Sequence, residues 1–316
     1  MRQLFKTRRR RIGMTVGLVG TLMVVTFTGY QLARSWTPAR LLALYVMGRA
    51  STCSLVESFR SAKNSAIQDT TTRRLLKTTR LVQNDPGGLE LWETEHGPFW
   101  ILSSSDMWFF CGMLAEQELD IYGAGVLGVH PGDIVLDCGA NFGIYTRKAL
   151  KSGASLVVAI EPAPDSIACL QRTFAREIRD GRVIVYPKGV WDKDDQLALR
   201  IAPHIPWGDS FVLLAPGAKG PVVPLTTIDK LVLELKLARV DFIKMDIEGA
   251  ERKAILGAQQ TLARYKPRMA ITVYHLPDDP TVVPLAVRRA VPSYRLQCGR
   301  CRYYRSHIQP EVMHFH

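Results

Sequence analysis

Acidic, amide and small residues gather where two short apolar runs of the sequence end. They are Asp137, Gly139, Ala140, Asn141 and Gly143 around the end of the run at 134–140, and Glu161 at the end of the run at 155–162. Glycine lets a ligand approach the backbone closely, and a carboxylate about 24 residues after Asp137 is placed to hold ribose hydroxyl groups. The dinucleotide fingerprint G-x-G-x-x-G is absent, because 139–144 reads GANFGI. A nucleoside without a pyrophosphate is therefore the favoured ligand.

These two apolar runs belong to a longer alternating pattern. Three further β-branched runs lie at 182–191, 240–249 and 268–276, and segments of helical composition, such as 164–179 and 250–265, separate them. Continuous apolar strands that alternate with helices predict a parallel sheet covered on both faces. In such sheets ligands bind at the carboxyl ends of the strands. We therefore expect an α/β fold with its ligand site along that edge.

Composition and charge exclude several classes of protein. The chain has 316 residues, 47% of them hydrophobic, which excludes a collagen, a low-complexity segment and a disulfide-dense miniprotein. Its net charge is +12, but nine basic residues and no acidic one lie in the first 56 residues, so three net charges are left for the rest. A nucleic-acid partner is not expected, because the folded part has too little positive charge for a basic face.

An N-terminal segment of 22 residues, 12–33, carries no charge. At about 1.5 Å per residue a helix of this length crosses a hydrocarbon core. We expect an uncleaved single-pass anchor in the lipid bilayer, with a cleaved signal peptide and a buried helix as the alternatives. Gly13 and Gly17 form a small-xxx-small pair through which two anchors could pack as a weak homodimer, although glycine is common in membrane helices.

The chain divides into four expected parts. They are a basic tail at 1–11, the anchor at 12–33, a helical stalk or linker at 34–87 and a folded domain at 88–316. A turn cluster at 84–88 marks the start of the domain. Its first segment, 89–103, has two alternating aromatic runs broken at 96–98, which predicts a β-hairpin.

Four motifs in order and register resemble the FkbM family of S-adenosylmethionine-dependent methyltransferases. They are VLDCGANFGIYT at 135–146, AIEPAP at 159–164, PLTTID at 224–229 and VDFIKMDIEGAE at 240–251. The similarity extends from about residue 88 to the C-terminus. It implies a Rossmann-like class I methyltransferase fold, with a mostly parallel seven-stranded sheet, helices on both faces and an antiparallel hairpin at its end. The tail at 293–315 is placed to supply that hairpin.

The resemblance also implies where S-adenosyl-L-methionine binds. Carried over by position, the residues beside the methionine part are Asp137, Gly139, Ala140, Asn141 and Gly143, the ribose ligand is Glu161, and the residues near the adenine are Val190, Trp191 and Asp192. For Trp191 an equally good interpretation is an aromatic side chain of the core or a loop. For Glu161 the alternative is an exposed acid that caps a helix.

Methyl transfer to a hydroxyl group requires a proton acceptor, because a sugar or aliphatic hydroxyl is a poor nucleophile at neutral pH. We expect Asp246 or His275 to accept the proton and Glu248 to orient the substrate or the base. Residues 244, 246 and 248 point to the same face while the chain is extended, so Lys244 is expected to pair with a carboxylate there. Glu251 is expected to be a carboxylate at a helix N-terminus. Many family members have a glutamate where this chain has Tyr274 and His275.

The function that the sequence favours is O-methylation of a hydroxyl group on a saccharide, a glycolipid or a secondary metabolite. Two other classes are open: a membrane-anchored scaffold that keeps the fold without turnover, and a nicotinamide-dependent oxidoreductase, which the missing fingerprint disfavours. The side of the membrane is also open. Six basic residues precede the anchor and three follow it, which favours an exported domain, whereas the cofactor is made in the cytosol.

Six cysteines are too few for a disulfide framework, and reduced thiols are expected. Cys298 and Cys301 have the spacing of metal ligands, so a structural zinc site and a redox-active pair are alternatives to ordinary thiols. No metal is expected to be required, although Mg²⁺ held by Asp246 is an alternative for catalysis.

Overall fold

The computed structural model of the chain describes residues 37–49, 52–200, 209–213, 220–304 and 307–316. Its helices are α2 (Thr37–Val46), α3 (Leu55–Thr78), α4 (Met107–Glu118), the 3-10 turn η1 (Gly125–Leu127), α5 (Ile144–Lys151), α6 (Pro164–Thr173), α7 (Ala175–Arg179), α8 (Ile228–Glu234), α9 (Glu251–Leu256), α10 (Gln259–Tyr265) and α11 (Asp279–Ala290). Its strands are β1 (Arg80–Asp85), β2 (Leu89–Thr94), β3 (Gly97–Leu102), β4 (Ile134–Cys138), β5 (Leu156–Ile160), β6 (Val183–Tyr186), β7 (Gly189–Val190), β8 (Asp195–Ala198), β9 (Val222–Thr226), β10 (Phe242–Met245), β11 (Arg268–Thr272), β12 (Leu296–Cys298), β13 (Cys301–Tyr304), β14 (His307–Pro310) and β15 (Val312–Phe315).

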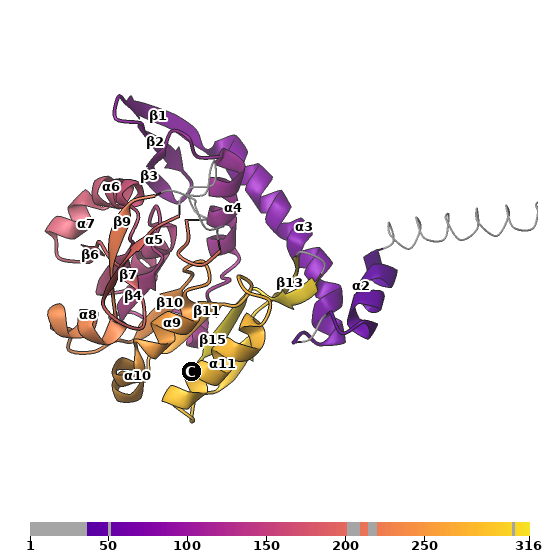
Figure 1. Cartoon of the computed structure of the whole chain (residues 1–316). Coiled ribbons are helices and arrows are strands. Elements are labelled where there is room, and N and C mark those ends of the chain that lie inside the picture. The colour runs from indigo at the N-terminus through magenta and orange to yellow at the C-terminus, as the bar shows by residue number, and fades with distance from the viewer. Residues whose placement is uncertain (1–36, 50–51, 201–208, 214–219, 305–306) are drawn as a thin grey trace, which may run out of the picture.

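A seven-stranded sheet forms the centre of the molecule, in the order β12-β15-β11-β10-β4-β5-β6 (Figure 1). The pairs from β11 to β6 are parallel, whereas β15 runs antiparallel to both β11 and β12. The five apolar runs of the sequence provide its parallel strands. The mostly parallel class I methyltransferase-like sheet expected from the sequence is therefore confirmed, and the expected terminal hairpin is the β12–β15 pair.

Alternate residues of each central strand pack against different helices. In β4, Leu136 belongs to the apolar core under α8 to α11, whereas Val135 belongs to the core under α5. The same alternation holds in β5 for Val158 and Val157. Helices therefore cover both faces of the sheet, because strands that are apolar at every position must bury both faces.

A small antiparallel sheet of β1, β2 and β3 lies beside α3 and α4. Strands β2 and β3 are the hairpin predicted at 89–103. However, β1 pairs with β2 across the turn at 84–88, and α3 packs along α4. The boundary expected at residue 88 thus falls inside one sheet, and the segment 55–85 packs as part of the fold rather than as a separate stalk.

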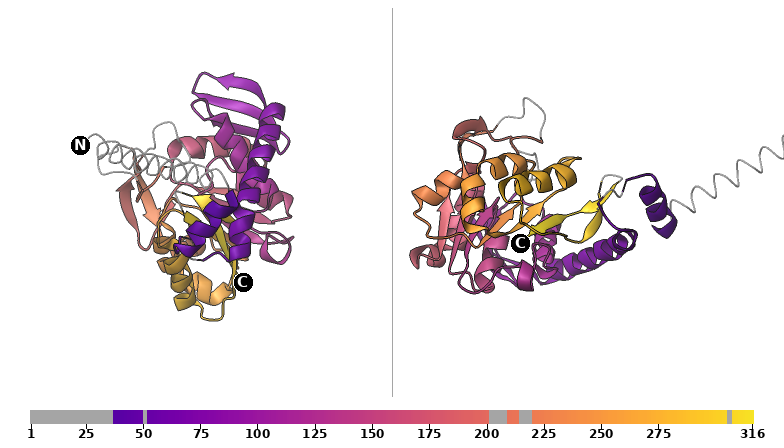
Figure 2. Two further views of the ribbon diagram at one scale, coloured as in Figure 1. Left: turned by 90° about the vertical axis from the view of Figure 1, so that its right-hand side faces the viewer. Right: turned by 90° about the horizontal axis from the view of Figure 1, so that it is seen from below.

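Between β12 and β15 the chain forms a second hairpin, β13–β14, which reaches α2 and α3 (Figure 2). There Cys53, in the turn between α2 and α3, forms a disulfide with Cys301, and the two Cα atoms are 6.3 Å apart. The expectation of reduced thiols is wrong for this pair, because packing brings together residues that are 248 positions apart. Cys301 is therefore not available to hold zinc or to form a redox pair with Cys298, which is free and exposed.

The expected membrane anchor at 12–33 lies outside the described residues. Among the helices that the structure describes, none combines the length and the apolar composition that a bilayer crossing needs.

Candidate active site

A cavity of about 600 Å³ opens at the carboxyl ends of β4, β5, β10 and β11. This is the edge at which parallel sheets bind ligands, and the volume is in the range of small-molecule sites. Eight of the predicted site residues line the cavity: Gly139, Ala140, Asn141, Glu161, Val190, Asp246, Glu248 and His275. The structure thus brings together the ends of strands that are more than 100 residues apart in the sequence.

The loop after β4 forms one end of the cavity. Gly139 has a φ of +79°, and a Cβ atom there would lie 2.0 Å from the carbonyl oxygen of Asp246. Only glycine lets the two strand ends approach so closely. Glu161 Oε2 accepts the Asn141 N–H and Oε1 accepts the Ala163 N–H, both at 2.9 Å. Burial raises the pKa of this carboxyl to about 7, although the two N–H groups oppose the shift.

Asp137 does not line the cavity. Its side chain is fully buried on the face of the sheet that α5 covers, where Asp137 Oδ2 accepts the Thr146 hydroxyl at 2.7 Å. Its other oxygen lies 3.2 Å from Lys244 Nζ on the neighbouring strand. Lys244 also donates to the Gly139 carbonyl oxygen at 2.7 Å. The predicted pairing of Lys244 with a carboxylate is therefore found with Asp137, and the pair fixes the start of the loop.

Three other predicted cofactor residues also lie outside the cavity lining. A Cβ atom at Gly143 would lie 2.2 Å from Phe174, so this glycine allows close packing under α5. Trp191 packs edge to face on Phe211, and Asp192 pairs with Lys253 at 2.6 Å. Of the three residues expected near an adenine, only Val190 borders the cavity, beside Gly189 and Lys188.

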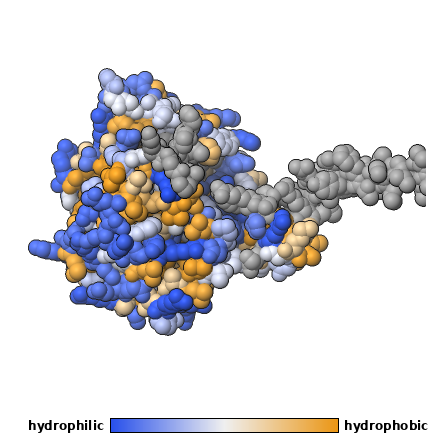
Figure 3. Space-filling view, viewed as in Figure 1, coloured by the Kyte–Doolittle hydropathy of each residue, from blue (hydrophilic) through white to orange (hydrophobic). Residues whose placement is uncertain are grey.

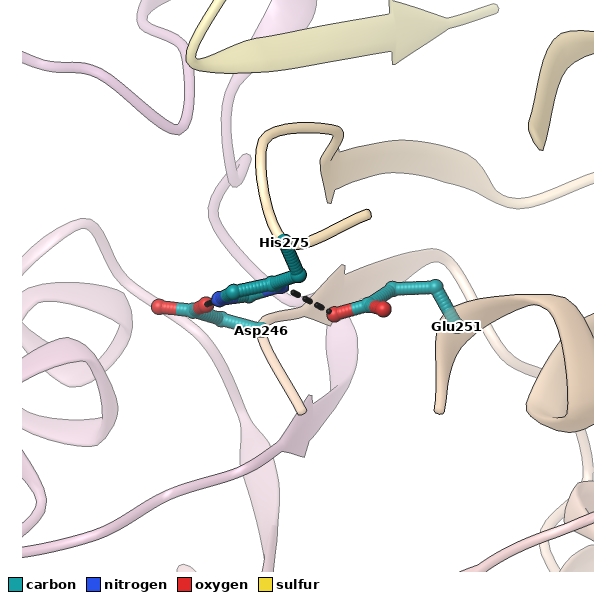
Figure 4. Close-up of side chains that lie close together, drawn as sticks. All are labelled: Asp246, Glu251 and His275. Atoms are coloured by element: carbon teal, nitrogen blue, oxygen red, sulfur yellow. Dashed lines mark hydrogen bonds and ion pairs between the residues drawn. The ribbon is translucent and has the colours of Figure 1, made fainter. Parts of the chain in front are cut away.

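His275 lines the cavity and lies between carboxylates, as Figure 4 shows for Asp246 and Glu251. Its Nε2 is 3.5 Å from Asp246 Oδ1 and 3.5 Å from Glu248 Oε1, while its Nδ1 is 2.9 Å from Glu251 Oε1. Burial alone would lower the pKa of His275, but Glu251 and Glu248 together raise it well above its usual value. The three residues predicted to be catalytic are thus adjacent, and the carboxylates favour the imidazolium form of His275.

Glu251 belongs to this candidate site, although the sequence indicated only a carboxylate at a helix N-terminus. It is the first residue of α9, and its Oε1 accepts the backbone N–H of Ile247 at 3.0 Å, as a helix N-terminal carboxylate does. The same oxygen contacts His275 Nδ1 and the Thr272 hydroxyl, and the side chain is fully buried. A buried carboxylate on one ring nitrogen fixes the tautomer and the orientation of a histidine.

The two carboxylate oxygens of Asp246 have different surroundings. Its Oδ2 accepts the Tyr122 hydroxyl at 2.7 Å. Its Oδ1 and His275 Nε2 are buried and have no hydrogen-bond partner within the described part of the chain. Burial opposes ionisation of Asp246, but Lys244 and His275 hold its pKa below the usual range. The site therefore presents an ionised carboxylate oxygen and an imidazole nitrogen side by side, with unused hydrogen-bonding capacity.

The opposite wall of the cavity comes from α3, α4 and the β13–β14 hairpin. Gln68 Nε2 donates to Glu116 Oε1 at 3.1 Å, and Arg300 Nη2 donates to Gln68 Oε1 at 2.6 Å. Arg302 donates to Glu311 Oε1 at 3.0 Å. Burial and the nearby Glu311 raise the pKa of Glu116 to about 7. Sequence reasoning did not find this wall, because its polar residues come from three separate segments.

The cluster around His275 also has the donors of a cation site. Asp246, Glu251 and His275 offer ligand atoms within 4.8 Å of one another. Two carboxylates and an imidazole could hold a divalent ion, although Glu251 Oε1 already serves His275 Nδ1 and the Ile247 N–H. That no metal is required stays a prediction.

No curated protein matches this chain. The crystal structure of methyltransferase FkbM from Methylobacillus flagellatus KT is 19% identical, with a TM-score of 0.47; the match covers 81% of this chain and 60% of that chain. The structure of TYW2 from Pyrococcus horikoshii in complex with MeSAdo is 12% identical, with a TM-score of 0.39; the match covers 73% of this chain and 70% of that one. This chain therefore spans less than two thirds of the first of these structures.

A sequence model of the methyltransferase FkbM domain matches residues 137–299. The match covers just over half of the chain and contains the loop after β4, the acid at the end of β5 and the cluster around His275. The resemblance found in the motifs is thereby confirmed, and the chain belongs to the FkbM family of methyltransferases.

Proposed function

We propose that this protein is an S-adenosylmethionine-dependent O-methyltransferase that acts on a hydroxyl group of a saccharide, a glycolipid or a secondary metabolite. One observation carries the proposal. The Gly139–Asn141 loop with Glu161, which suits a nucleoside, and the Asp246–His275 pair, which suits a hydroxyl group, open into one cavity. Methyl transfer needs these two ligands side by side, because the protein contributes mainly their alignment and the removal of a proton.

The residues at the end of β4 and β5 fit the cofactor. Gly139 lets the loop after β4 lie against the Asp246 carbonyl oxygen at the edge of the cavity, and the Glu161 carboxylate borders the cavity with its two oxygens fixed by backbone N–H groups. Ribose hydroxyls would donate to that carboxylate and replace the water that it loses on burial. When bound, S-adenosylmethionine supplies an electrophilic methyl group on a sulfonium ion.

We assign His275 Nε2 as the proton acceptor. Glu251 holds the Nδ1–H side of the ring, so Nε2 faces the cavity next to Asp246 Oδ1. The acceptor hydroxyl would donate its proton towards Nε2, and Asp246 and Glu248 would orient it and stabilise the imidazolium that forms. Because the pKa of His275 is raised, the base form of the site grows as the pH rises. If Asp246 were the acceptor instead, its low pKa would make the rate independent of pH in the neutral range.

The charges of the cavity favour an acceptor without negative charge. Of the described residues that line it, seven are Asp or Glu and three are Lys or Arg. An acceptor that carries a phosphate or a carboxylate would meet this acidic surplus in a site of low dielectric. Trp108 and Phe109 at the start of α4 add exposed aromatic surface beside the polar wall. A neutral polyol with one apolar face suits both features.

We also propose that residues 12–33 anchor the protein in a membrane with its domain on the non-cytoplasmic side. Six basic residues before this segment and three after it favour that orientation. The Cys53–Cys301 disulfide favours it as well, because disulfides persist in oxidising compartments. This placement requires that the cofactor reaches that side of the membrane.

The test of the activity is transfer of an isotopically labelled methyl group from S-adenosylmethionine to a panel of neutral and anionic saccharides and glycolipids. The full chain is assayed beside Asp246→Asn, His275→Gln and the surface variant Asp180→Asn. Label in an O-methyl group of a neutral acceptor, lost with the first two variants and kept with the third, supports the proposal. Label on nitrogen or carbon, or turnover that survives His275→Gln unchanged, would contradict the assignment.

A further inference from the structure

Two helices at the start of the described chain carry a group of exposed apolar side chains, which we call the elbow patch. Its members are Leu42, Tyr45, Val46 and Met47 on and just after α2, and Leu55, Val56 and Phe59 in the first turns of α3. Val46 is 77% exposed and Met47 is 68% exposed. Figure 3 shows apolar surface over α2, at the end of the molecule away from the central sheet. Single exposed apolar residues are ordinary, but this many on two adjoining helices mark a contact surface.

Helix α2 is apolar on two opposite sides. Leu44 is buried in a small core with Ile308 and the Cys53–Cys301 disulfide. At about 100° per residue, Leu42 and Val46 lie on the side of the helix opposite Leu44. Among the described residues, packing therefore accounts for one side of α2 only. The other side needs a second apolar environment.

We propose that the elbow patch lies in the interfacial layer of the membrane that holds residues 12–33. The uncharged segment ends at Ala33, and α2 begins at Thr37, so three residues separate the segment from the helix that bears the patch. Arg34, Arg40 and Arg49 follow the segment before any acidic residue. Apolar side chains flanked by basic residues are the composition of helices that lie in the interface of a bilayer. This inference rests on the proposed anchor and not on the proposed methyl transfer.

The elbow patch is tied to the wall of the cavity at two places. The disulfide joins the α2–α3 turn to β13, and the Ile308 N–H donates to the Arg49 carbonyl oxygen at 2.7 Å. The same hairpin contributes Arg302 to the cavity. Along α3, Gln68 in the cavity wall follows Leu55 by 13 residues, which is about 20 Å of helix. The elbow patch and the cavity wall are thus joined by covalent and backbone contacts, and about 20 Å of α3 separates them.

The test measures how deeply individual positions of the full chain lie in a bilayer. Nitroxide labels are attached at Val46→Cys and Val56→Cys in a Cys298→Ser background, which removes the exposed free thiol and keeps the disulfide. Leu233→Cys on α8 is the matched control, because Leu233 is 70% exposed and lies on a helix far from α2 (Figure 1). The protein is reconstituted in vesicles of phosphatidylcholine and phosphatidylglycerol at roughly three to one, an anionic surface. Collisions with oxygen, which enters lipid, and with a nickel chelate, which stays in water, are then compared.

We expect the ratio of oxygen to nickel accessibility at positions 46 and 56 to exceed that at position 233 severalfold. A ratio equal to the control in protein that floats with the vesicles would overturn the elbow proposal and leave the anchor intact. Exclusion of both reagents, with spin–spin broadening that disappears on dilution with unlabelled chain, would show that a second copy covers the patch and would also overturn it. Protein that does not float with the vesicles would refute the anchor and, with it, this inference. None of these results depends on methyl transfer.

Discussion

Replacing Glu161 by glutamine measures the electrostatic cost of burying its carboxylate. Glu161 is 8% exposed, and burial raises its pKa from the usual 4.5 to about 7. An acid whose pKa is raised on folding destabilises the folded state progressively as the pH rises from 4.5 to 7, and the cost is constant above that. With about 1.4 kcal/mol per pKa unit, the cost grows by about 2.5 kcal/mol between pH 5 and pH 8. Glutamine has no such cost at either pH.

The assay is urea unfolding of the full chain in detergent micelles, for the wild type and Glu161→Gln at pH 5 and pH 8. The difference in unfolding free energy between the two proteins should change by about 2–3 kcal/mol in favour of the variant as the pH rises. Any fixed cost of placing an amide against the N–H groups of Asn141 and Ala163 cancels in this comparison. Asp180→Asn, at an exposed site, should show no such change. A shift for Glu161→Gln below about 0.5 kcal/mol would refute the reasoning.

Three further predictions concern the reaction centre, the loop and the disulfide. The kcat of methyl transfer should rise with pH through a pKa above that of an ordinary histidine. Glu251→Gln should lower this kinetic pKa by about 1–2 units, because the carboxylate stabilises the imidazolium. An unchanged kinetic pKa would show that His275 is not the titrating group. Gly139→Ala should lower the unfolding free energy by at least about 2 kcal/mol more than Gly132→Ala does. Both glycines have positive φ, but of the two only Gly139 would bring a Cβ atom against backbone, 2.0 Å away. Equal thermal shifts for the two variants would argue against the close approach. Cys53→Ser should lower the unfolding free energy by about 2–4 kcal/mol, whereas Cys298→Ser should not; equal urea midpoints for these two variants would mean that the disulfide does not form.

The sheet and its functional edge could be predicted because their signals are local. Continuous apolar runs define the strands, and the carboxyl ends of parallel strands must meet along one edge. Glu161, Asp246 and His275 therefore fall together whatever the details of packing. The alternation of side chains along a strand could also have corrected the prediction for Asp137. Asp137 lies on the same face of β4 as Val135, towards α5, and so turns away from the cavity.

The remaining contacts depend on packing that no local pattern encodes. Tyr122 reaches Asp246 across 124 positions, and Cys53 reaches Cys301 across 248. The carboxylate of Glu251 fits the expected helix N-terminus, but its contact with His275 depends on the distance between α9 and the end of β11. The polar wall of the cavity likewise requires α3 to pack along the domain, where the sequence suggested a separate stalk.

Isothermal titration of S-adenosylmethionine into the full chain in detergent micelles tests the central claim most directly. We expect binding in the micromolar range, weakened by about 1–3 kcal/mol in Glu161→Ala, which is the effect of leaving ribose hydroxyls without their acceptor. Asp180→Asn, at an exposed residue that does not line the cavity, should bind as the wild type does. A folded chain that shows no heat of binding, or one in which Glu161→Ala binds as tightly as the wild type, would contradict the assignment of this cavity to the methyl donor.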